Sequence, residues 1–80
     1  MALTIEIPND EPLELMDLTP LWTVSQLKER LSTMVGMPAS KQKLVTVTGV
    51  ALRNTYTLAL SGLKSGDRVT LSAKERGGKK

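Results

Sequence analysis

Residues 23–45 read TVSQLKERLSTMVGMPASKQKLV, and this stretch decides the fold. Thr23 and Gln26 have the spacing of a capping box, in which the threonine hydroxyl accepts from the Gln26 N–H and the glutamine reaches back. Gly36, followed two positions later by a proline, ends the pattern, because glycine tolerates left-handed backbone and proline cannot continue a helix. We therefore predict a helix over residues 23–35.

The apolar side chains of this stretch recur with the 3.6-residue period of a helix that covers a core; they are Val24, Leu27, Leu31, Met34 and Val35. Trp22 precedes the cap by one residue, and Leu27 follows the cap by four. That is the spacing of a hydrophobic staple, so we expect a structural role for Trp22. For Tyr56 we favour turn packing over ligand stacking.

Toward the N-terminus, residues 3–7 alternate apolar and polar side chains, which predicts a half-buried strand. Residues 8–12 hold two prolines with Asn and Asp and predict a turn. Residues 13–18 should return antiparallel to the first strand. The pairing register of this second strand stays open. Leu15 and Met16 are adjacent and apolar, and both can face inward only if the strand has a bulge.

Toward the C-terminus, residues 43–48 predict a third strand and residues 51–52 a short fourth one. Residues 57–60 suit a single helical turn. Residues 68–74 alternate again and predict the final strand. Residues 75–80 have no apolar side chain, so we expect a disordered tail.

This order of elements favours an α+β domain in which a mixed sheet of four or five strands packs on one helix. We place the domain at residues 1–74 and a flexible basic Arg-Gly-Gly tail at residues 75–80. Nothing in the pattern suggests more than a monomer.

Charge is distributed unevenly along the chain. Residues 1–40 carry two basic and six acidic side chains, a net charge of −4, whereas residues 41–80 carry nine basic and two acidic ones, a net charge of +7. A polarised chain of this kind favours a face for an anionic partner.

The chain has no cysteine and no histidine, the residues that most often serve as nucleophile, general base and zinc ligand. It also lacks a glycine-rich phosphate loop. We therefore expect no enzyme activity, no metal and no cofactor. No apolar run approaches the length of a membrane span, and we expect no membrane partner.

Residues 23–45 resemble ubiquitin in order: a threonine cap, a helix, Gly-apolar-Pro, and a polar loop ending in Gln-basic-Leu-apolar. Gly49, Leu52 and Thr57 also fit, and the final strand runs into an Arg-Gly-Gly sequence. This resemblance covers nearly the whole chain and implies the ubiquitin-like β-grasp fold.

Residues 36–39, 41–44 and 74–80 resemble more closely the ubiquitin-like domains of the large subunits of splicing factor 3a, a part of the U2 small nuclear ribonucleoprotein (U2 snRNP). Ala51 and the pair at residues 60–61 stand where that family has aromatic side chains, so the chain resembles a divergent member. The resemblance implies an RNA-binding, nuclear domain of the spliceosome that acts in mRNA splicing. Its implied partners are a stem-loop of U1 small nuclear RNA (U1 snRNA) and, through the parent protein, other spliceosomal proteins.

The same resemblance indicates which residues would contact RNA. The basic ones would neutralise phosphates, and the glycines would let the backbone approach a groove closely. The predicted RNA-binding residues are Lys41, Lys43, Arg53, Lys74, Arg76, Gly77, Gly78, Lys79 and Lys80. Arg53 does not follow from the resemblance: Arg53 and Arg68 either extend a basic face from the tail or are ordinary exposed charges.

Two alternatives remain open. In the first, the chain is a ubiquitin-like modifier whose residues after Gly78 are removed. In the second, it is a protein-interaction module that uses its strand surface. The positions that match ubiquitin's apolar receptor patch include Val45, Thr70 and Ser72 and are largely polar, which disfavours a ubiquitin receptor as the partner.

Overall fold

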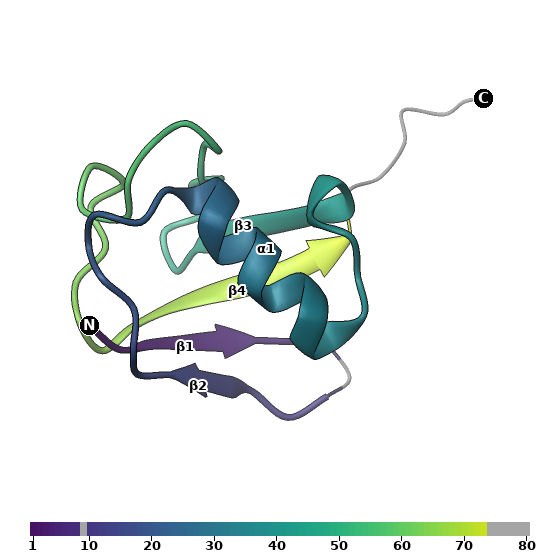
Figure 1. Cartoon of the computed structure of the whole chain (residues 1–80). Helices are drawn as coiled ribbons and strands as arrows, with labels where there is room; N and C mark the ends of the chain where they lie inside the picture. The colour runs from purple at the N-terminus through teal and green to yellow at the C-terminus, as the bar shows by residue number, and fades with distance from the viewer. Residues whose placement is uncertain (9, 74–80) are drawn as a thin grey trace.

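The computed structural model describes residues 1–8 and 10–73. Its elements in chain order are β1 (Leu3–Glu6), β2 (Leu13–Leu15), α1 (Val24–Val35), the short 3-10 helix η1 (Ala39–Lys41), β3 (Gln42–Thr46) and β4 (Asp67–Ala73). The four strands form one sheet in the order β2-β1-β4-β3, and α1 lies across one face of it (Figure 1). The predicted α+β architecture is confirmed.

The two central strands give the sheet its mixed character. β1 pairs antiparallel with β2 and parallel with β4, while β4 pairs antiparallel with β3. The parallel pair places Ile5 beside Val69, and both side chains are buried. A crossover that contains α1 makes this parallel pairing possible, because parallel neighbours need a long connection.

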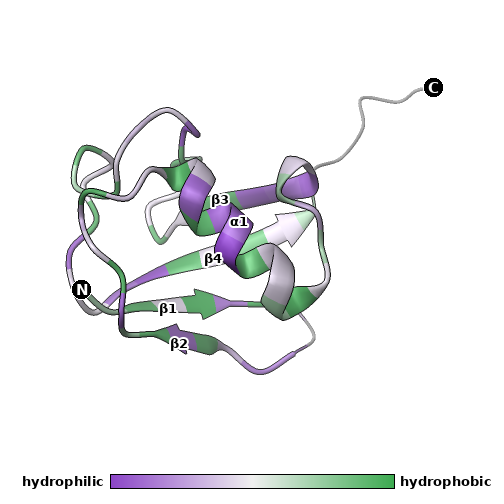
Figure 2. Cartoon of the chain, viewed as in Figure 1, coloured by the Kyte–Doolittle hydropathy of each residue, from purple (hydrophilic) through white to green (hydrophobic). Residues whose placement is uncertain are grey.

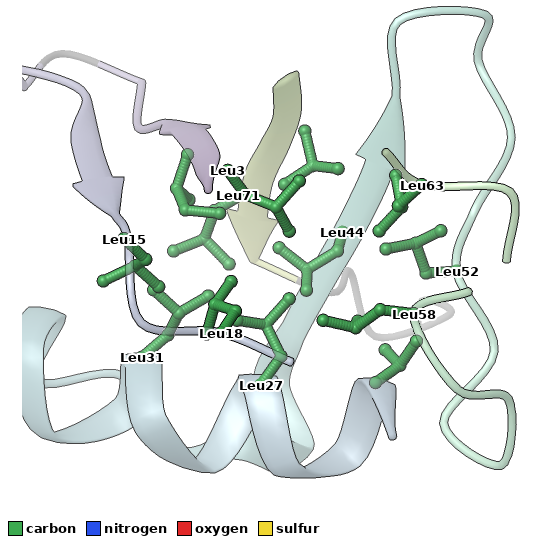
Figure 3. Close-up of a cluster of buried hydrophobic side chains, with 13 residues drawn as sticks. Leu3, Leu15, Leu18, Leu27, Leu31, Leu44, Leu52, Leu58, Leu63 and Leu71 are labelled. Carbon is green, nitrogen blue, oxygen red and sulfur yellow. The ribbon is translucent and has the colours of Figure 1, made fainter. Parts of the chain in front are cut away.

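The core lies between α1 and the sheet. Leu27 and Leu31 project from the helix toward Leu3, Leu44 and Leu71 of the strands (Figure 3). Further leucines from the connection between β3 and β4 close one end of this cluster. Figure 2 shows hydrophobic residues along β1 and β2, and hydrophobic turns that alternate with hydrophilic ones on α1.

The start and end of α1 follow the predicted caps. Gln26 N donates to Thr23 Oγ1 at 3.1 Å, and Thr23 N donates to Gln26 Oε1 at 2.8 Å, which completes the capping box. Gly36 adopts φ 74°, a left-handed conformation that strains residues with a side chain. Trp22 is half-buried against the core cluster that contains Leu27, in agreement with its expected structural role.

Two sequence predictions about packing need correction, and one open question is settled. Met34 is 47% exposed and lies outside the core cluster, which Leu31 and the half-buried Val35 reach from this end of α1. β2 ends at Leu15, which is buried, and Met16 is 69% exposed, so no bulge is needed to accommodate the adjacent pair. Residues 51–52 form only an isolated bridge, from Ala51 to Val45, and the sheet has four strands.

Other boundaries differ slightly. β1 ends at Glu6, one residue before Ile7, and β3 ends at Thr46, where a turn begins. The predicted helical turn is present, because Ser61 N donates to Thr57 O at 2.9 Å. Within the described residues, no helix combines the length and apolar character needed to cross a membrane. The predicted tail at residues 75–80, like Lys74, lies outside the described residues.

A candidate RNA-binding groove

An open groove of about 900 Å³ lies among α1, the start of β3, the end of β4 and the loop that follows residue 50. We call it the basic groove. It is lined by Lys28, Lys43, Leu44, Ala51, Leu52, Arg53, Asn54, Thr55, Ser72 and Ala73. Three of these side chains are cationic, and none of the described residues that line the groove is acidic. The lining therefore favours an anionic ligand.

β3 sets the position of Lys43. Side chains alternate between the two faces of a strand, and the neighbours Gln42 and Leu44 are buried, so Lys43 points to the outer face. Gln42 anchors the start of this strand: its Nε2 donates to Lys28 O at 2.8 Å and to Met37 O at 2.9 Å. The buried glutamine thereby joins β3 to α1 and to the loop after it.

Arg53 begins a tight turn that is fastened to the start of α1. Tyr56 N donates to Arg53 O at 3.1 Å, which closes the turn. Val24 N donates to Tyr56 O at 2.8 Å, and Ser25 N donates to Asn54 O at 3.2 Å. These bonds satisfy helix N–H groups that otherwise lack partners and fix the turn at the groove.

Sequence reasoning missed Lys28 and Asn54. Lys28 is buried, and its Nζ donates to Asn54 Oδ1 at 2.7 Å, a third link between α1 and the turn. The burial of Lys28 could have been predicted from its spacing. Lys28 follows Val24 by four residues and precedes Leu31 by three, so all three lie on the same side of the helix. Asn54 is 26 residues away in the sequence, and no local pattern indicated that it contacts Lys28.

The other predicted site residues are placed as follows. Lys41 is exposed at the end of η1, two residues before Lys43, but does not line the groove. Arg68 lies elsewhere: its Nη1 donates to Glu6 Oε2 at 3.0 Å, in an exposed ion pair. Lys74, Arg76, Gly77, Gly78, Lys79 and Lys80 lie outside the described residues. The described chain stops at Ala73, which itself lines the groove.

The outer face next to the groove is polar, as the sequence indicates. Val45 lies opposite Thr70 and Lys43 opposite Ser72 in the β3–β4 pair. Thr70 is exposed, and Val45 and Ser72 are half-buried. These four residues present two hydroxyl groups, one cation and one apolar side chain.

Residues 3–76 match the Ubiquitin family, and the chain therefore belongs to the ubiquitin family. This agrees with the four-stranded mixed sheet and single helix. The domain is accordingly of a non-catalytic kind.

Within that family the chain is similar to splicing factor 3A subunit 1. It is 37% identical to the probable splicing factor 3A subunit 1 of Dictyostelium discoideum, over 98% of this chain and 10% of that protein. It is 33% identical to the probable Arabidopsis thaliana protein, over 99% of this chain and 10% of that one. Identity to splicing factor 3A subunit 1 of Mus musculus is 40%, over 71% of this chain and 7% of that protein. The chain thus spans about a tenth of the curated relatives that it matches.

Proposed function

We propose that this domain is an RNA-binding module of a pre-mRNA splicing factor and that it contacts a stem-loop of U1 small nuclear RNA. The observation that carries the proposal is the convergence of Lys43 and Arg53, ten residues apart in sequence, on one groove whose described lining residues include no acidic side chain. The similarity to splicing factor 3A subunit 1 supports a spliceosomal context and, with it, action in the nucleus.

The groove and the C-terminal segment act together in this proposal. Lysine and arginine side chains neutralise phosphates, which supplies affinity more than sequence preference. The basic segment Lys74–Lys80, which follows Ala73 in the sequence, adds phosphate contacts to those of Lys43 and Arg53 in this proposal. Lys41, exposed just before β3, adds a contact at the margin. Other spliceosomal proteins are reached through the remainder of the parent protein.

The proposal is tested by titrating a labelled U1 stem-loop RNA with the full chain and with a chain ending at Glu75, at several salt concentrations. The shorter chain lacks Arg76, Lys79 and Lys80. Each lost phosphate contact flattens the log–log dependence of affinity on salt by about 0.7–0.9. Weaker binding with a flatter slope supports the proposal, and the absence of binding by the full chain rejects it.

A further inference from the structure

The sequence contains two aromatic residues, Trp22 and Tyr56, and they differ in their surroundings. Trp22 packs against the core, with the Arg30 guanidinium 5.9 Å from its ring centroid. Tyr56 belongs to no core cluster and is 37% exposed, and the guanidinium carbon of Arg53 lies 5.7 Å from its ring centroid. Tyr56 does not itself line the basic groove, but it contacts Arg53, which does.

The backbone holds this arginine–tyrosine pair in place. The two residues are the first and last of one closed turn, and the turn is fastened to α1 at Tyr56 O and Asn54 O. The Lys28–Asn54 hydrogen bond adds a side-chain link from the helix. The Arg53 guanidinium is thus held over the Tyr56 ring by a turn that is itself fastened to α1, which reduces the ordering cost of binding.

We propose that this Arg53–Tyr56 surface binds an unpaired nucleobase by stacking, while the phosphates beside that base lie in the basic groove. The inference rests on the proposed RNA-binding function and names the part of the RNA that this site takes. Every base has a π-face, and aromatic rings and arginine planes both stack on it. A base-paired stem offers no free base face here, so the site selects RNA with a single-stranded loop or bulge.

The composition of the groove favours a nucleotide over an acidic peptide. Arg53 can contact both the base and the phosphate of a nucleotide. Its guanidinium is planar and stacks on a base, and its N–H groups donate hydrogen bonds to a phosphate. Lys43 and Arg53 line the groove as cations, while Ser72 and Thr55 add hydroxyl groups. An acidic peptide would satisfy the charges but would leave the ring surface uncovered.

The test uses the full chain and two RNA hairpins that share one stem. The first has a natural single-stranded loop; the second has abasic nucleotides throughout the loop, so it keeps the phosphates and loses the bases. Tyr56→Leu removes the ring, and Arg53→Lys keeps the charge but removes the plane. Tyr56→Phe and Arg68→Lys are the matched controls, since the first keeps the ring and the second alters an arginine outside the groove.

We expect Tyr56→Leu to weaken binding of the natural hairpin roughly five- to tenfold, the low end for one stacked base. Arg53→Lys should weaken it in the same direction, and both controls should bind like the wild type. On the abasic hairpin, Tyr56→Leu and the wild type should bind equally. Thermal melting of each variant shows whether the fold is intact.

The outcomes separate this inference from the proposed function. If the wild type binds the natural hairpin and Tyr56→Leu binds it equally well, the stacking site is wrong and the phosphate groove stands. If Tyr56→Leu weakens binding of both hairpins alike, the ring acts on the shape of the turn and the stacking site is again wrong. If the wild type binds neither RNA, the proposed function itself fails.

Discussion

Lys43 of β3 lies directly opposite Ser72 of β4 in the antiparallel pair, one residue before the described chain stops at Ala73. The register therefore puts a cation of the domain body beside one of the last described residues, and the basic sequence that begins at Lys74 follows two positions after Ser72. The proposed RNA-binding role rests on Lys43 together with Arg53, which lines the same groove.

Alanine substitution in the groove should weaken RNA binding without affecting the fold. For Lys43→Ala and Arg53→Ala we expect a roughly two- to fivefold loss each, because an exposed ionic contact contributes up to about 1 kcal/mol. The salt slope should flatten by about 0.7–0.9 per contact. Filter binding of the U1 stem-loop RNA measures both quantities.

Arg68→Ala is the matched control for these two variants, since Arg68 is an exposed cation engaged with Glu6 outside the groove. It should bind RNA within twofold of the wild type, a tolerance of about 0.4 kcal/mol. A loss of affinity for Arg68→Ala as large as that for Lys43→Ala would mean that net charge, and not the groove, governs binding.

The buried glutamine should matter for stability. Gln42→Leu keeps the side-chain volume but leaves Lys28 O and Met37 O without the amide that donates to them. Lys28 O lies inside α1 and keeps its helix hydrogen bond, and the substitution also removes Gln42 Oε1, a buried atom without a hydrogen-bond partner. We therefore expect a loss of about 1 kcal/mol in the free energy of unfolding by urea, the low end of the cost of an unmade hydrogen bond. Lys43→Ala, an exposed neighbour, should change it by less than about 0.5 kcal/mol. A Gln42→Leu variant as stable as the wild type would show that these hydrogen bonds contribute nothing net.

Asp17 provides a pH prediction away from the groove. The Arg30 Nη2 donates to Asp17 Oδ2 at 2.9 Å, and this hydrogen bond holds the pKa of the Asp17 carboxyl below its ordinary value of 3.8. Because the folded pKa is lowered, the contribution to stability is present above the unfolded pKa and is lost as the pH falls through the folded pKa. An NMR titration of the Asp17 carboxyl carbon should show the depressed pKa.

Arg30→Gln should raise that pKa back toward 3.8, whereas Arg68→Gln should leave it unchanged, because Arg68 pairs with Glu6. An Asp17 carboxyl that titrates identically in the Arg30→Gln variant and the wild type would contradict the ion pair as the cause.

The role of the C-terminal segment also separates RNA binding from the modifier alternative. If Lys79 and Lys80 contact phosphates, removing them would remove two cations from the complex. We therefore expect mass spectrometry of cell extracts to recover peptides that span the Gly78–Lys79 bond. Recovery only of chains that end at Gly78, or of Gly78 joined to another protein, would favour the modifier.

Local signals in the sequence were enough to predict α1 closely, because its capping box and left-handed glycine act within a few residues. The ends of the strands were harder to predict, because they depend on pairing with residues that are distant in the sequence. Ala51 forms only a bridge to Val45, flanked by the hydrogen bonds from Thr46 N to Val50 O and from Leu52 N to Leu44 O. Lys43 was predicted as a binding residue from a resemblance and Arg53 from its charge. Lys28, Asn54 and the Arg53–Tyr56 contact depend on tertiary structure and could not be predicted from local pattern.

The central claim, that RNA lies in the basic groove, is tested most directly by mapping backbone amide chemical shifts of the isotope-labelled chain during titration with U1 stem-loop RNA. The account predicts that the largest changes among residues 1–73 occur at Lys43, Arg53, Asn54, Ser72 and Ala73. It also predicts small changes along β2 and at the Glu6–Arg68 pair. Shifts concentrated at those latter sites, or no shifts at all, would contradict the claim.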